Sequence, residues 1–204
     1  MDSLLRDIDN SELYNSALAA DFSAVRSSWN LGEDEVVDWD NYRVLAPVDE
    51  VQKAIEEEEH AYLTIIQSDK DSVIGGSRAA CEAVLKRLGN PERIALGHDL
   101  AVHCSVVEPF GDQWRDLHTR KTKAPKDIRF YSSYQDGAYK ITRKSVADAL
   151  TGQALQTIDF RRIIEAAWND GVRIFVEHGP RNSLTSAIDE ILGDRPHLAV
   201  ALDH

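Results

Sequence analysis

The sequence of 204 residues contains little cysteine and no long apolar run. Cys81 and Cys104 are too few for a disulfide framework, so a reducing compartment, the cytoplasm, is expected. No stretch approaches the roughly 20 apolar residues that span a bilayer, and the N-terminus lacks a basic segment followed by an apolar one. The sequence therefore predicts neither a membrane span nor a secretory leader. Its 43% hydrophobic and 28% charged residues are typical of a soluble globular protein.

Positive charge is also scarce, with 23 Lys and Arg against 35 Asp and Glu. The net charge of −12 argues against nucleic acid as a partner, because such binding needs basic side chains to neutralise phosphates. The exception is the segment 115–129, where basic side chains outnumber Asp116 and Asp127. Charge runs usually face water, and the alternative is a docking patch for an acidic partner. The basic side chains are Arg115, Arg120, Lys121, Lys123, Lys126 and Arg129.

Several common site motifs are absent. The seven histidines and two cysteines form no close-spaced pair of the kind that binds zinc, so no metal is expected. The sequence has no glycine-rich phosphate loop and no Gly-x-Ser-x-Gly nucleophile turn. With these motifs absent, the candidate for acid–base chemistry is His103, in the segment Leu100-Ala101-Val102-His103-Cys104-Ser105.

The pattern of apolar residues predicts an α+β / α/β protein in three parts. Residues 1–40 form an acidic, partly helical segment in which positions 18, 22, 25 and 29 share one helical face. Residues 41–97 follow the order β-α-β-β-α-β of a ferredoxin-like subdomain, with Ser77 as the cap of its second helix. Residues 98–204 alternate helices and strands as in part of an α/β body. The elements expected there are helices at 106–118, 157–170 (capped by Thr157) and 183–192, and strands at 128–132, 172–176 and 197–202.

Four short motifs then occur in order along the second half of the chain. They are Val102-His103-Cys104-Ser105-Val106-Val107-Glu108-Pro109, Phe130-Tyr131-Ser132-Ser133 with Gly137, Gln153-Ala154-Leu155-Gln156-Thr157-Ile158-Asp159-Phe160, and Val176-Glu177-His178-Gly179-Pro180-Arg181-Asn182-Ser183-Leu184-Thr185. In this order they resemble F-H-S-x-x-M-x-P, F-Y-S-S-x-x-G, N-L-x-x-P-V-x-F and V-E-x-G-P-x-x-x-L-T of acyltransferase domains. The chain thus resembles the malonyl-CoA:acyl-carrier-protein transacylase-like domains of polyketide and fatty-acid synthases. The segment 39–76 resembles, more finely, the polyunsaturated-fatty-acid synthases.

The resemblance implies a ferredoxin-like subdomain within an α/β-hydrolase-like body and a role for each matched residue. His103 would be the general base and acid, since an imidazole with a pKa near 6.5 can take and return a proton. The main-chain carbonyl of Gln153 would orient the ring, so that the side-chain identity of residue 153 would matter little. Val102 would face the substrate. Without the resemblance, the pattern favours a structural histidine at a strand end for His103, and His178 departs from the family pattern.

The same resemblance implies the partners: an acyl-CoA, the phosphopantetheine of an acyl carrier protein and neighbouring synthase domains, with no bound cofactor. Arg115, Arg120, Lys121, Lys123 and Lys126 would face the carrier protein. The family's nucleophile turn, G-H-S-x-G, and its carboxylate-binding arginine have no counterpart among the 204 residues.

Ser77 is no substitute for the nucleophile, because it lies at a helix start. The chain alone is therefore expected to be inactive as an acyltransferase of malonyl type. The alternatives are a non-catalytic docking or structural module of a synthase and, more weakly, a free ferredoxin-like regulatory domain. The last interpretation leaves the motifs after residue 98 unexplained.

Overall fold

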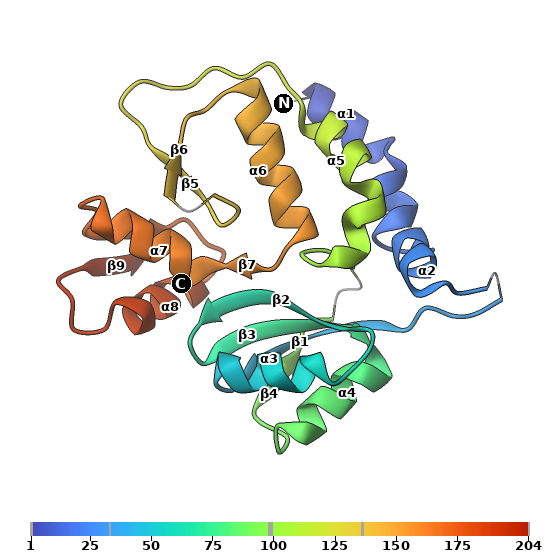
Figure 1. Ribbon diagram of the computed structural model, residues 1–204. Helices are drawn as coiled ribbons and strands as arrows, with labels where there is room; N and C mark the ends of the chain where they lie inside the picture. The colour runs from blue at the N-terminus through green and yellow to red at the C-terminus, as the bar shows by residue number, and fades with distance from the viewer. Residues whose placement is uncertain (1, 33, 98–99, 136, 204) are drawn as a thin grey trace.

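A computed structural model describes residues 2–32, 34–97, 100–135 and 137–203 (Figure 1). Three helical segments come first: α1 (Asp2–Asp9), the π-helical turn η1 (Leu13–Ala17) and α2 (Ser23–Trp29). The small subdomain follows, with β1 (Trp39–Leu45), α3 (Val48–Glu56), β2 (Ala61–Ser68), β3 (Asp71–Ser77), α4 (Arg78–Arg87) and β4 (Arg93–Ala95). The body contains η2 (Ser105–Phe110), α5 (Gly111–His118), β5 (Phe130–Ser132), β6 (Gly137–Tyr139), α6 (Arg143–Leu155), β7 (Ile158–Asp159), α7 (Phe160–Asn169), β8 (Ile174–Glu177), α8 (Ser183–Leu192) and β9 (Leu198–Ala201).

The small subdomain has the expected β-α-β-β-α-β order, and its sheet runs β4-β1-β3-β2 with antiparallel neighbours. Helices α3 and α4 cover one face of this sheet (Figure 1), where Val51 and Val84 pack against Val44 and Ile74. Ser77 caps α4 as predicted, since its hydroxyl accepts the Ala80 N–H at 3.2 Å.

A fifth strand extends this sheet from outside the small subdomain. Strand β7 pairs in parallel with β2, placing Ile158 opposite Ile65. The Thr157 hydroxyl donates to the Leu63 carbonyl at 2.6 Å just before this strand. The prediction that Thr157 caps the following helix is wrong: Asp159 is the cap, and its side chain accepts the Arg161 N–H. An aspartate is an equally good cap, and the pairing of β7 moves the start of the helix two residues on.

The N-terminal segment packs onto the body and the sheet, but not as one continuous helix. The predicted apolar face over 18–29 is interrupted where Ala20 and Phe22 adopt positive φ angles of 57° and 51°. Leu18 therefore follows η1, while Val25 lies on α2, and both side chains are still fully buried. The spacing of apolar residues therefore predicted correctly that these side chains are buried, but it did not reveal the break in the helix between them.

Helix α6 was not expected from the sequence, because its buried face consists of small residues. The buried positions are Ala147, Ala149, Gly152 and Ala154, which give a weak apolar pattern. A capping box of Thr142 and Ser145 defines its start. The other expected elements of the body are present within one to three residues of their predicted ends. Among the described residues, no helix has the length and apolar character to cross a bilayer.

Candidate functional site

His103 lies where the chain leaves the small subdomain and meets the end of α6. Its main chain is left-handed, with φ of 62°, and its N–H donates to the Ala154 carbonyl at 2.7 Å. Its ring Nδ1 lies 2.5 Å from the main-chain oxygen of Gln153. The structure therefore brings together the two residues, 50 positions apart, that the motifs single out.

The contact has a simple cause in helix geometry. The last four carbonyls of an α-helix have no partner within the helix, and Gln153 and Ala154 lie in the last turn of α6. This end of a helix also carries partial negative charge, which favours a cation nearby. A histidine held here has a partner for its ring N–H and an environment that stabilises an imidazolium. In this respect the helix end takes the part that a carboxylate has in a Ser-His-Asp triad.

The protonation of His103 suits a base at neutral pH. Burial lowers the pKa of His103, and its hydrogen bond with the Gln153 carbonyl opposes this shift in part. The ring is therefore neutral at pH 7. Because a carbonyl only accepts hydrogen bonds, the proton is assigned to Nδ1, which leaves the lone pair on Nε2 available for proton transfer.

The neighbouring thiol is not a nucleophile for this base. Cys104 is only 4% exposed and packs among Phe22, Val25 and Trp39. Burial raises the pKa of Cys104 to about 12, with a small opposing effect from a hydrogen bond with the Val106 main chain. A thiol in this environment stays protonated at neutral pH and does not attack an ester or thioester.

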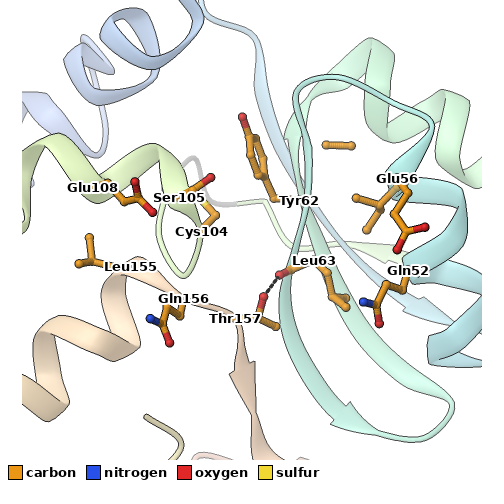
Figure 2. Close-up of a pocket in the computed structure, with 12 residues that line it drawn as sticks. Gln52, Glu56, Tyr62, Leu63, Cys104, Ser105, Glu108, Leu155, Gln156 and Thr157 are labelled. Atoms are coloured by element: carbon orange, nitrogen blue, oxygen red, sulfur yellow. Dashed lines mark hydrogen bonds between the residues drawn. The ribbon is translucent and has the colours of Figure 1, made fainter.

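A cleft of about 470 Å³ lies beside this junction, between the small subdomain and the body (Figure 2). Tyr62 and Leu63 of β2 line one side, and Ser105 and Glu108 of η2 line the other. Among the described residues, the lining includes the two residues after His103 but neither His103 nor Val102. The cleft therefore adjoins the junction, and His103 is not among its lining residues.

The remaining predicted residues lie elsewhere. Val102 is half-buried and packs against the cluster of Leu13, Leu18 and Trp114, so the N-terminal helices cover it in this structure. His178 is exposed at the end of β8. Glu177, from the fourth motif, is buried and accepts the N–H groups of residues 184 and 185 at the start of α8.

The basic segment divides into two kinds of residue. Arg115 is ion-paired with Asp148 on α6, and Arg120 with Asp7 on α1 at 2.6 Å. Arg115 thus links α5 to α6, and Arg120 links the segment after α5 to the N-terminal helix α1. The three lysines that complete the prediction are all exposed: Lys121, Lys123 and Lys126. Arg129, at the end of the segment, is exposed as well and is ion-paired with Asp170 at 3.1 Å.

Sequence reasoning missed one residue at the site. The side-chain amide of Gln153 donates to the Ser133 hydroxyl at 3.2 Å, and Ser133 is only 8% exposed. The signal available in the sequence was the Phe130-Tyr131-Ser132-Ser133 motif, whose second serine has no evident role in a strand. Its contact with α6 could not be expected without the helix.

Comparisons with known proteins show which proteins the chain resembles. The chain is 29% identical over 216 aligned residues to a polyunsaturated fatty acid synthase subunit from Thraustochytrium, matching 99% of the chain and 10% of that protein. The chain thus spans about a tenth of the length of this curated relative. A comparison with models of protein families gives no match.

Solved structures show the same fold. The acyltransferase domain from the second module of the salinomycin polyketide synthase matches with a TM-score of 0.69 at 22% identity, over 84% of this chain and 41% of that one. The malonyl-CoA:acyl carrier protein transacylase of Helicobacter pylori matches with a TM-score of 0.71 at 17% identity, over 88% and 56%. The chain therefore resembles a polyunsaturated fatty acid synthase subunit in sequence and acyltransferase domains in fold.

Proposed function

We propose that this chain forms the base-bearing part of an acyltransferase that moves a malonyl-type acyl group from CoA to an acyl carrier protein in fatty-acid or polyketide synthesis. The observation that carries the proposal is the His103 ring, held through Nδ1 by the Gln153 carbonyl at the end of α6. The similar proteins named above support the reaction class, since they are acyltransferases and synthases.

In the proposed mechanism, Nε2 of His103 takes the proton of a serine hydroxyl as that oxygen attacks the thioester carbonyl of acyl-CoA. The C–S bond then breaks, His103 returns the proton to the CoA thiolate, and an acyl-serine ester remains. In the second half, His103 deprotonates the phosphopantetheine thiol, which attacks the ester. The proton then returns to the serine oxygen. The imidazolium formed in each half is stabilised by the Gln153 carbonyl and the negative end of α6.

We propose that the serine comes from polypeptide outside these 204 residues, so that the chain alone transfers no acyl group. The supporting feature is the two-stranded parallel sheet of β8 and β9. One face packs on α7 and α8 through Phe175 and Ala199, while Ile174, Val176 and Leu198 are 63%, 47% and 53% exposed. Parallel sheets are usually covered on both faces, so this open apolar face fits a further layer of the same body.

The exposed lysines of the segment 115–129 are proposed to contact the carrier protein. Lys121, Lys123 and Lys126 provide a cationic surface, whereas Arg115 and Arg120 are engaged within the chain. The same surface supports the alternative function, a docking module without catalysis. The two functions differ in whether His103 is needed.

The test is to co-express the chain with the segment encoded upstream of it and to follow acyl transfer from malonyl-CoA to a holo carrier protein. We expect transfer with both polypeptides and none with this chain alone. His103→Ala should lower the rate by about 10²–10⁴-fold, the usual contribution of a general base, while the exposed control His178→Ala should not. Full activity in His103→Ala would disprove the assignment of the base.

The docking surface is tested in the same assay. Replacing Lys121, Lys123 and Lys126 together by glutamate should raise KM for the carrier protein and leave kcat unchanged. A different result would favour the docking module instead: the reconstituted complex transfers no acyl group but still binds the carrier protein through these lysines.

A further inference from the structure

The direction of the His103 ring depends on one turn of helix. Both anchors of this residue, the Gln153 and Ala154 carbonyls, belong to the last turn of α6. Helix ends fray because their final carbonyls lack intrahelical bonds. Whatever fixes this turn therefore fixes the imidazole.

A short segment after β5 packs directly on this turn. The Ser133 hydroxyl accepts a hydrogen bond from the Gln153 side-chain amide at 3.2 Å. The ring of the next residue, Tyr134, lies over Gly152 so closely that a Cβ there would overlap it. The segment itself is held by the Ser132 hydroxyl, which accepts the Tyr134 N–H at 3.3 Å. Residues 132–134 thus fix the residue whose carbonyl holds the histidine.

We propose that Ser133 is a positioning residue for His103, acting through the side chain and then the main-chain carbonyl of Gln153. The three groups form a chain: Ser133 Oγ, Gln153 amide and carbonyl, His103 Nδ1. This inference replaces the expectation that the side chain at position 153 matters little. A role for this contact in catalysis rests on the proposed function, but the orientation of the His103 ring is a property of the chain itself.

The tautomer of His103 reports this orientation directly. A well-placed Gln153 carbonyl favours the proton on Nδ1, and a displaced one lets it populate Nε2. Loss of one hydrogen bond of ordinary strength changes such an equilibrium about fivefold. The ratio of the two tautomers can be read from the imidazole ¹⁵N chemical shifts of the histidine-labelled chain above the pKa of the ring.

The experiment compares variants of the full chain. Ser133→Ala should raise the Nε2–H fraction of His103 about fivefold, and Gln153→Leu should do the same. The Nε2–H fraction in the double variant should be no higher than in either single variant, because both substitutions remove the same hydrogen bond. Ser133→Thr keeps the hydroxyl and should restore the wild-type ratio. Ser72→Ala removes a buried hydroxyl on β3, outside both the segment 132–134 and α6, and it serves as the control.

A second histidine provides an internal reference. The ring Nδ1 of His118 lies 2.7 Å from the Trp114 carbonyl, a similar bond with no link to Ser133. Its tautomer ratio should stay constant in every variant. An unchanged His103 ratio in Ser133→Ala, or an equal change in Ser72→Ala or at His118, would overturn the proposal.

If Ser133→Ala fails to fold, the ratio measured in Gln153→Leu decides the question, and an unchanged ratio there overturns the proposal. The outcome is also separable from that of the acyl-transfer assay. A responsive tautomer in a chain that supports no transfer would leave the positioning intact and reject the proposed function.

Discussion

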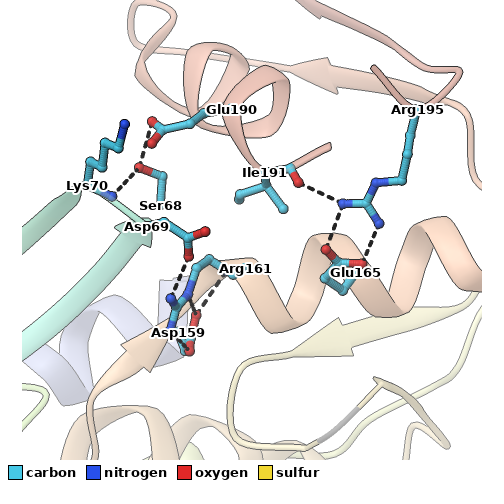
Figure 3. Close-up of polar contacts among 9 residues, drawn as sticks. All are labelled: Ser68, Asp69, Lys70, Asp159, Arg161, Glu165, Glu190, Ile191 and Arg195. Atoms are coloured by element: carbon cyan, nitrogen blue, oxygen red, sulfur yellow. Dashed lines mark hydrogen bonds and ion pairs between the residues drawn. The ribbon is translucent and has the colours of Figure 1, made fainter. Parts of the chain in front are cut away.

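Asp69, in the turn between β2 and β3, is ion-paired with Arg161 of α7 across 92 residues of sequence, with 2.7 Å between carboxylate and guanidinium (Figure 3). The same guanidinium makes two further bonds to Asp159, at 3.0 and 2.8 Å. One arginine therefore links the small subdomain to the cap of α7. Figure 3 shows a second link nearby, where the Ser68 hydroxyl donates to Glu190 of α8 at 2.7 Å.

The two ion pairs of Arg161, with Asp69 and with Asp159, should differ in strength. Asp69 is 78% exposed, so Asp69→Asn should lower the free energy of unfolding by less than about 1 kcal/mol, as for other surface ion pairs. Asp159 is 19% exposed and bound at two points, so its coupling to Arg161 should be larger. Urea unfolding of the single and double variants gives both coupling energies. A larger coupling for Asp69 than for Asp159 would contradict this ranking.

Gly152→Ala should destabilise the chain although alanine favours helices. The gain in helix propensity is about 1 kcal/mol, whereas the new Cβ would overlap the Tyr134 ring and force it to move. Overpacking typically costs about 1–3 kcal/mol, so the net change should be unfavourable. The measurement is the midpoint of thermal or urea unfolding. Tyr134→Ala removes the obstacle, and in that background Gly152→Ala should no longer be harmful.

Glu177 should contribute a pH-dependent part of the stability. Burial on its own raises the pKa of Glu177, but hydrogen bonds from Thr185 and Leu184 outweigh it, and the net pKa is lowered. A carboxyl group with a lowered folded pKa stabilises the folded state fully above its unfolded pKa of about 4.3, and loses this contribution as the pH falls through the folded pKa. Glu177→Gln should therefore cost stability at pH 7 and progressively less below about pH 4. If Glu177→Gln lowered the free energy of unfolding equally at pH 7 and below about pH 4, the charge of Glu177 would play no part in stability.

Both thiols should be inert in the folded chain. Cys81 and Cys104 are 0% and 4% exposed, and burial raises the pKa of each to about 12. Neither should react with a thiol reagent at a pH of about 7.5 until the chain is unfolded, after which two thiols should be titrated. Rapid labelling of Cys104 in the native chain would mean that the segment beside His103 opens.

Much of this fold follows from local patterns in the sequence. The small subdomain could be predicted because its strands are rich in β-forming residues bounded by polar turns and its second helix has a clear cap in Ser77. The contact of His103 with Gln153 could be expected only from the order of motifs, because no local pattern joins residues 50 positions apart.

What could not be predicted depends on tertiary packing. Helix α6 has a buried face of alanines and a glycine, so its burial leaves almost no hydrophobic periodicity. Because α6 was not predicted, the contact of Ser133 with Gln153 and the ion pair of Arg115 with Asp148 could not be predicted either. The turn at Ala20–Phe22 was missed because burial on both sides of it continues the helical spacing.

The pairing of β7 with β2 has a consequence for how far the small subdomain and the body can move relative to each other. Strand β7 belongs to the body by chain order and to the small subdomain by its main-chain hydrogen bonds. Swinging the two parts open would break these bonds together with the bond from Thr157 to Leu63. We therefore expect the small subdomain and the body to move as one rigid frame, without the hinged opening found in many two-lobed enzymes.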